Sequence, residues 1–119
     1  MRLMNNMKSL LVVLALTLSG CAVVLPHQHD PVMFSHIVDT KILVDKLNCD
    51  NKDWNNAGYY VERLKVYAVL RNDPQADAIV KLEEALIKAR GSSNKTFCES
   101  ALTIQRARID VIIKAWSGR

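Results

Sequence analysis

The chain has 119 residues, of which 50% are hydrophobic, and its 16 basic and 12 acidic residues give a formal net charge of +4. This length suits one compact domain and is too short for two. The positive excess is too small to indicate a nucleic-acid partner, and none of the four glycines forms part of a phosphate-binding loop motif. The sequence therefore predicts a small single domain that binds neither nucleic acid nor nucleotide.

A short apolar stretch near the start of the chain indicates an export signal. It is about ten residues long, whereas a segment that crosses a bilayer needs roughly 20. The stretch ends in Leu18, Ser19, Gly20 and Cys21. This order resembles the lipobox of bacterial lipoprotein precursors, which implies diacylglycerol on the Cys21 thiol, cleavage just before it, and a membrane anchor of acyl chains. Ala22 stands where enteric inner-membrane lipoproteins typically carry Asp, so the resemblance implies the periplasmic face of the outer membrane in a Gram-negative host.

Cleavage before Cys21 divides the chain into a signal peptide (residues 1–20), a lipidated tether (residues 21–30) and a domain (residues 31–119). Of the 119 residues, 99 then remain, with 14 basic and 12 acidic side chains and a formal charge of +2. A charge this small is typical of an ordinary solvated surface. The expected body is one small domain beside a membrane.

Histidines cluster in and after the tether. His27, His29 and Asp30 lie close together, and His36 follows a few residues on. Copper, nickel or zinc would suit such side chains, but a mobile linker lacks the fixed geometry that a functional site needs. We therefore expect no metal and no cofactor.

Cysteine parity predicts a disulfide. With Cys21 lipidated, Cys49 and Cys98 remain in a compartment that is normally oxidising. A metal or redox role is disfavoured because the two lack Cys-x-x-Cys spacing and a histidine nearby in sequence. In the loop-closure treatment, a crosslink across about 50 residues contributes around 4 kcal/mol of stability. The disulfide would compensate for a small core.

Apolar periodicity predicts two helices in the first half of the domain. The first is expected from Asp30, a suitable N-cap with Pro31 in the first turn, to about Asn48. Its apolar face comprises Phe34, Ile37, Val38, Val44 and Leu47. The second is expected from about Trp54 to Arg71. Its packing face comprises Ala57, Tyr60, Val61, Leu64, Tyr67 and Ala68.

The second half predicts two more helices. Asp73 as N-cap and Pro74 at the first position begin the third, which ends near Arg90 with Gly91 as terminator. Its core face comprises Ile79, Val80, Leu82, Leu86 and Ile87. The fourth is expected from Lys95 to Trp116. Its apolar side comprises Cys98, Leu102, Ile109, Ile112 and Trp116, widened by Ala101, Ile104 and Val111.

The fold class that follows is all-α: an up-down bundle of about four helices with one disulfide. No stretch shows sustained period-two alternation, so a sheet is not expected. Alternating directions make the first helix antiparallel to the fourth, which brings Cys49 and Cys98 to the same end. Acidic residues four positions before basic ones, as in Asp110 and Lys114, predict pairs along the helix surfaces.

No catalytic constellation is present in the sequence. Adjacent Glu83 and Glu84 project about 100° apart on a helix and cannot act as a facing acid and base. Ser92 and Ser93 have no histidine motif that would activate a nucleophile. We therefore predict that the protein is not an enzyme and has no catalytic residues.

Tyrosines provide the candidate interface. Tyr59 and Tyr60 cannot both face the core, and Arg63 follows one turn later. Tyrosine and arginine are enriched where proteins bind one another. The competing interpretation places the tyrosines around the core with their hydroxyls in water. Residues 59, 60 and 63 therefore remain the predicted contact with a partner.

The favoured function is a membrane-anchored envelope lipoprotein that acts as a non-catalytic interaction or assembly module. The layout also resembles type II secretion pilotins, which have a lipobox, a cysteine ending the first helix (here Cys49) and a cysteine opening the last (Cys98). That resemblance implies a chaperone that takes a secretin segment to the outer membrane. Two further hypotheses stay open: an exclusion lipoprotein of phage or plasmid origin, which genomic neighbourhood would identify, and an enzyme or ligand carrier, which needs a deep polar pocket.

Overall fold

The computed structural model describes residues 28–119. This part of the chain folds into four helices, which are α2 (Pro31–Asp45), α3 (Asn55–Leu70), α4 (Ala76–Gly91) and α5 (Lys95–Ser117). No strand occurs among these residues, so the predicted all-α fold is confirmed. Residues 1–27, which hold the lipobox with Cys21, His27 and most of the expected tether, lie outside the described residues. Within 28–119, no helix combines the length and the apolar character that crossing a bilayer requires.

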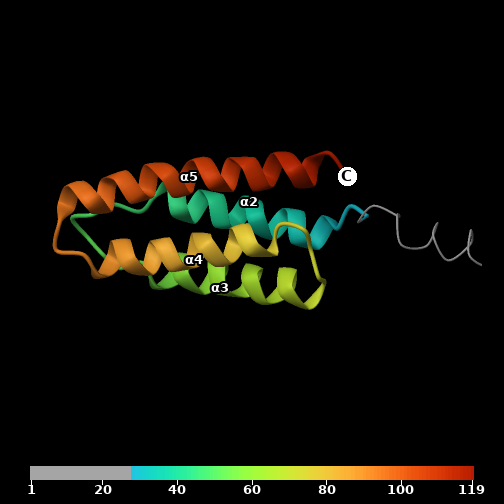
Figure 1. Ribbon diagram of the computed structural model, residues 1–119, viewed down its shortest axis with the longest axis horizontal. Coiled ribbons are helices and arrows are strands. Elements are labelled where there is room, and N and C mark those ends of the chain that lie inside the picture. Colours follow the sequence, from blue (N-terminus) through green and yellow to red (C-terminus); the bar gives the residue numbers. More distant parts are fainter. Residues whose placement is uncertain (1–27) are drawn as a thin grey trace, which may run out of the picture.

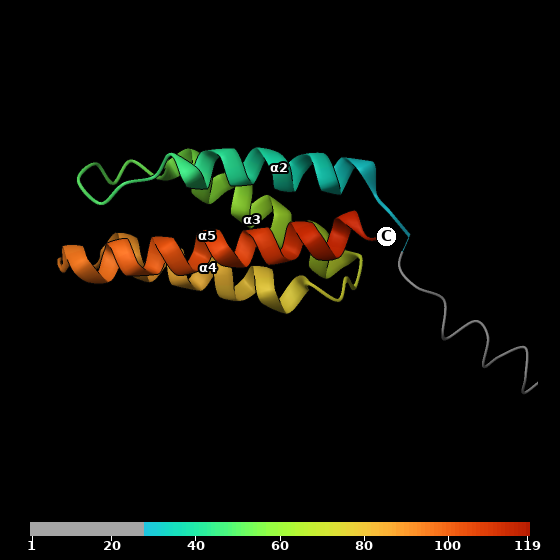
Figure 2. The same ribbon diagram turned by 90° about the horizontal axis from the view of Figure 1, so that it is seen from above.

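The helices alternate in direction around one core (Figures 1 and 2). α2 packs against α3 and α5, and α4 packs against the same two helices, so α2 and α4 are diagonal to each other. One end of the bundle contains the connections 46–54 and 92–94, and we call it the disulfide end. The other end contains residues 28–30, the α3–α4 turn at 71–75 and the C-terminus, and we call it the tether end (right side of Figure 1).

The core contains one line of apolar side chains from each helix. Its members are Met33, Ile37 and Val44 from α2, Ala57, Val61, Leu64 and Ala68 from α3, Ile79, Leu82, Leu86 and Ala89 from α4, and Cys98, Leu102, Ile109, Ile112 and Trp116 from α5. Four residues that the sequence places on apolar faces are instead exposed: Val38 by 37%, Ile87 by 64%, Ile104 by 57% and Val111 by 64%. Each helix touches only two neighbours, so a wide apolar stripe extends beyond the area that the neighbours cover.

The helix starts match the predictions at α2 and differ at α4. Asp30 caps α2, and its Oδ1 accepts hydrogen bonds from the Val32 and Met33 amides at 3.0 and 3.1 Å. α4 begins at Ala76 and not at Pro74. The predicted cap Asp73 accepts a hydrogen bond from the Gln75 amide at 2.8 Å, and the same carboxylate is buried against the C-terminal end of α5. Gly91 is the last residue of α4 instead of following it.

Within residues 28–119, five of the seven ion pairs join segments that are distant in sequence, and two follow one helix. Asp110 accepts from Lys41 of α2 at 2.8 Å, where the sequence predicted a pair with Lys114. Glu83 of α4 accepts from Lys65 of α3 at 2.6 Å. Spacing along one helix cannot show these contacts, because they depend on which helix lies alongside.

The predicted disulfide is present at the end of the bundle named for it. Cys49 and Cys98 are bonded, with an S–S distance of 2.10 Å and a Cα–Cα distance of 6.1 Å. Cys98 is buried in the first turn of α5. The bond therefore ties the connection after α2 to the start of α5.

Candidate functional site

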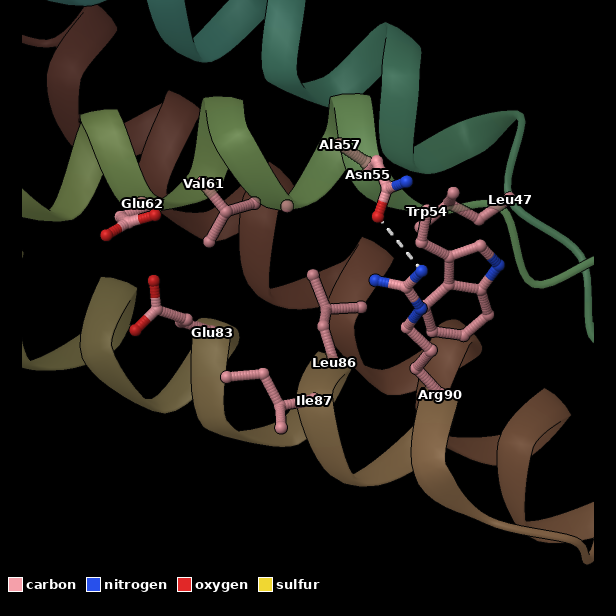
Figure 3. A pocket seen from close by; sticks show the side chains of 11 residues that line it. Leu47, Trp54, Asn55, Ala57, Val61, Glu62, Glu83, Leu86, Ile87 and Arg90 are labelled. Atoms are coloured by element: carbon pink, nitrogen blue, oxygen red, sulfur yellow. Dashed lines mark hydrogen bonds between the residues drawn. The ribbon is translucent and has the colours of Figure 1, made fainter.

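A groove runs between α3 and α4 near the disulfide end (Figure 3). Its volume is about 270 Å³. The apolar residues that line it are Leu47, Trp54, Ala57, Gly58, Val61, Leu86 and Ile87. Of these, Trp54, Ala57, Val61 and Leu86 belong to the core, so the groove lies directly over the core. Ligand sites are typically concave and lined mainly by apolar side chains.

The groove exists because a glycine stands on one of its walls. Gly58 lies within α3 on the side that faces α4, and a Cβ atom built there would meet no other atom within 4 Å. A larger residue would fill this space. On the opposite wall, Ile87 of α4 is 64% exposed although it belongs to an apolar stripe. The sequence shows Gly58 only as an interruption of a helix, so the groove could not be predicted from it.

Charged residues of opposite sign mark the two ends of the groove. At one end Glu62 of α3 and Glu83 of α4 point toward one another (Figure 3). The Lys65 amine donates to Glu83 at 2.6 Å, and this hydrogen bond raises the Lys65 pKa. At the other end the Arg90 guanidinium donates to Asn55 Oδ1 at 3.0 Å and to the Lys52 carbonyl at 3.1 Å. The groove is therefore apolar along its floor, acidic at one end and basic at the other.

The predicted interface residues lie on a different face, the outer side of α2 and α3. Tyr60 is half-buried, and its ring stacks on His36 with centroids 5.1 Å apart and planes 7° from parallel. His36 Nε2 also donates to the Tyr60 carbonyl at 3.0 Å. Tyr59 is 60% exposed and meets Tyr60 edge to face, and Arg63 is exposed one turn away. α2 thus holds Tyr60, while Tyr59 and Arg63 present their side chains to solvent.

Two carboxylates organise the tether end. Burial raises the pKa of Asp73, but Arg119, the Gln75 amide and the Trp116 indole all stabilise its charged form, and the net pKa lies below the ordinary value. Arg119 donates to this carboxylate at 2.6 and 3.0 Å. The side chain of Asp73 is only 2% exposed. It therefore links the α3–α4 turn to the end of α5.

Asp30, near the start of the described residues, is the second carboxylate that connects two segments at the tether end. Desolvation raises its pKa, but the Met33 amide, the Tyr67 hydroxyl and Arg71 outweigh this effect, so its pKa is lowered. The Tyr67 hydroxyl donates at 2.9 Å, and Arg71 forms an ion pair with the same carboxylate oxygen. Asp30 therefore connects the entry of α2 to the last turns of α3.

The remaining polar candidates occupy separate positions. Within residues 28–119, no group of three or more His, Cys, Asp or Glu side chains is arranged to hold a metal ion. His36 is engaged with Tyr60, and Glu83 with Lys65. Glu84 is exposed on α4. The groove between α3 and α4 combines apolar core residues with charged residues at both of its ends.

Comparisons of the chain with protein families, with curated proteins and with solved structures find no match. The role of these surfaces therefore has to follow from the chemistry of the residues themselves.

Proposed function

We propose that this protein is a lipid-anchored lipoprotein of the cell envelope whose helical body binds a protein partner in the groove between α3 and α4. The lipobox order at residues 18–21 supports the anchor, and the resemblance implies the periplasmic face of the outer membrane in a Gram-negative host. The single observation that carries the binding role is the apolar groove opened by Gly58. The core residues beneath it are only 1–6% exposed, so the apolar surface that a partner meets is chiefly Ile87, which is 64% exposed on the wall formed by α4.

The position of the groove suits recognition away from the membrane. The described chain begins at the tether end, whereas Trp54, Ile87 and Arg90 lie toward the disulfide end (Figures 1 and 3). An anchor at the opposite end leaves the part of the groove at Trp54 and Arg90 far from the point where the chain enters the domain. A partner in the periplasm can then reach it without passing the lipid surface.

The charges of the groove define the partner's chemistry. A complementary segment has a large apolar side chain for the floor, a basic residue for Glu62 and an acidic residue for Arg90. Such a pattern on a helix or strand matches the known ways in which grooves take peptides. Charge complementarity at the rim favours one direction of binding over the other.

The anchor is tested by replacing Cys21 with Ala and fractionating the cells. We expect the unaltered protein in the membrane fraction with an acylated N-terminus at Cys21, and the C21A variant in the soluble fraction or with an uncleaved leader. Mass measurement of the purified protein reads the modification directly. An unaltered protein with an intact leader or without acyl groups would refute the anchor.

The groove is tested by site-specific photo-crosslinking in intact cells. A benzoyl-phenylalanine at Ile87 should yield a discrete adduct, whereas the same group at Ile104 on α5, which is similarly exposed, should not. Gly58→Leu should abolish the adduct by filling the groove. Gly58→Ala adds one methyl group and should retain most of it, which makes it the matched control.

Both substitutions should leave the protein folded, because the added Cβ atom at residue 58 meets no other atom within 4 Å. Replacing a helical glycine stabilises a helix by roughly 0.5–1 kcal/mol. We therefore expect both variants to melt at or above the temperature of the unaltered protein. An adduct at residue 87 that persists in Gly58→Leu would place the partner outside the groove.

A pilotin-like chaperone is the second candidate, and the disulfide is the observation that favours it. Cys98 lies in the first turn of α5, as the layout resemblance implies, whereas Cys49 lies in the connection after α2, which ends at Asp45. On this hypothesis the groove partner is a segment of an outer-membrane secretin. Identification of the residue-87 adduct as a secretin would support it, and any other envelope protein would favour the general interaction module.

A further inference from the structure

We infer that the outer face of α2 and α3 at the tether end rests on the lipid bilayer and orients the anchored body. The inference rests on the proposed lipid anchor and extends it. The patch consists of Val32, Arg63, Val66, Leu70 and Arg71, and we call it the lipid-side patch. Leu70 is 81% exposed, more than the other large apolar side chains of residues 28–119, and Val32 and Val66 are exposed by 62% and 48%.

These residues form one surface although they come from two helices. Arg63, Val66 and Leu70 follow each other at spacings of three and four along α3, which puts them on one side of the helix. They border a shallow depression together with Tyr67. Val32 of α2 borders an adjacent depression that also includes Arg63 and Tyr67. Tyr67 therefore lies between the apolar residues of the two helices.

The position of the patch specifies its occupant. Asp30 is bound to Tyr67 and Arg71, so the chain enters the domain directly beside the patch. Fully extended at about 3.3 Å per residue, residues 21–29 cover at most about 30 Å. A lipid-bearing Cys21 thus keeps this end of the bundle within a short distance of the bilayer. At that distance the tether gives the patch a high effective concentration at the bilayer surface, so a weak contact is enough to orient the body.

The composition fits a lipid interface. Exposed aliphatic side chains flanked by arginines are typical of surfaces that lie at the level of the head groups, where the arginine stems lie along apolar surface and their guanidinium groups reach phosphates. Arg63 is exposed toward solvent, whereas Arg71 is partly neutralised by Asp30. Glu62 adjoins the patch on the side toward α4 and limits it there.

Fluorescence quenching by brominated lipids tests the contact. The anchored protein with Leu70→Trp is placed in vesicles of phosphatidylethanolamine and phosphatidylglycerol with bromine on the upper acyl chain. The two native tryptophans, Trp54 and Trp116, are 3% and 2% exposed and contribute a constant background. The control carries Ile104→Trp on α5, at a site 57% exposed. We expect the signal of the introduced tryptophan to fall about twofold at residue 70 and to stay unchanged at residue 104.

Equal quenching at residues 70 and 104, or none at either, would overturn the inference. Arg63→Glu in the Leu70→Trp background should reduce the quenching by at least half, because it repels phosphatidylglycerol. Undiminished quenching in that variant would overturn the role assigned to Arg63. Circular dichroism and the intact disulfide mass confirm that each variant is folded.

An unacylated chain that begins at residue 21 and carries Cys21→Ser tests the lipid contact independently of the anchor. Added to the same vesicles at high lipid concentration, it should show quenching at residue 70 and none at residue 104 even if the protein from cells carries no acyl group. No quenching at residue 70 overturns the patch while leaving the anchor intact. Concentration-dependent dimerisation without vesicles that Leu70→Ser abolishes would assign the patch to a second copy and likewise overturn the inference.

Discussion

The two ends of the bundle are closed by different chemistry. At the disulfide end, the Cys49–Cys98 bond joins the connection after α2 to α5. At the tether end, Asp73 receives hydrogen bonds from Arg119 and Trp116, and Asp30 receives them from Tyr67 and the start of α2. One end thus depends on a covalent bond and the other on buried or partly buried charges.

The two ends therefore stabilise the domain by mechanisms that respond to different conditions. A disulfide acts mainly by restricting the unfolded chain, and it responds to redox conditions. A buried carboxylate with matched donors responds to pH instead, since protonation removes the charge that its partners stabilise. The groove lies toward the covalent end and the lipid-side patch lies at the charged end. Substitutions at the disulfide end should therefore make stability less dependent on redox conditions, and substitutions at the tether end should make it less dependent on pH.

The largest effect is expected from breaking the covalent end. Cys49→Ser together with Cys98→Ser should lower the free energy of unfolding by about 4 kcal/mol, because the unfolded chain regains the entropy of a loop of 49 residues. Urea unfolding monitored by helical circular dichroism measures this loss. A reductant should weaken the unaltered protein by a similar amount and leave the double variant unchanged. A loss below about 1 kcal/mol would contradict the prediction.

A smaller effect is expected from breaking the charged end at Asp73. Its pKa is lowered in the folded protein, so its contribution is fully present above the unfolded value of 3.8 and is lost as pH falls through the folded pKa. Asp73→Asn should cost about 2 kcal/mol at pH 7, and this difference should shrink as pH falls below about 4. Unfolding curves from pH 7 to pH 2 measure it.

Asp50 at the disulfide end is the matched control for Asp73. It pairs with Lys95 at 2.9 Å, but its side chain is 75% exposed. Asp50→Asn should change stability by less than about 0.5 kcal/mol at any pH in that range. An equal pH dependence for the Asp73 and Asp50 variants would show that burial does not distinguish the two ends.

The smallest effect is expected between the two ends, at Gln105 near the middle of α5. Its side chain is 4% exposed, and its Oε1 atom has no hydrogen-bond partner among the described residues. Gln105→Leu should therefore raise the free energy of unfolding by about 1 kcal/mol. Ser100→Leu, at an exposed site on the same helix, should change it by less than about 0.5 kcal/mol. A loss of stability in Gln105→Leu would indicate that an ordered water or a rearranged contact satisfies the amide.

The helices and the disulfide could be predicted from the sequence because their signals are local or countable. Apolar residues at spacings of three and four mark the core face of each helix, as at Val61, Leu64 and Ala68. Asp30 followed by Pro31 marks the start of α2. Cysteine parity marks the disulfide, and alternation of four helices brings its partners to one end.

The packing of the helices against one another determines which apolar residues stay in solvent and which polar ones are buried. Ile87 and Ile104 fit the apolar stripes, yet each helix touches two neighbours and cannot cover a stripe that wide. Asp73 accepts from the Gln75 amide as a cap would, but its burial against Trp116 and Arg119 depends on where the end of α5 lies. The groove needed both Gly58 and the facing wall of α4. Periodicity along one helix describes that helix alone, whereas a site depends on which helices lie side by side and at what height.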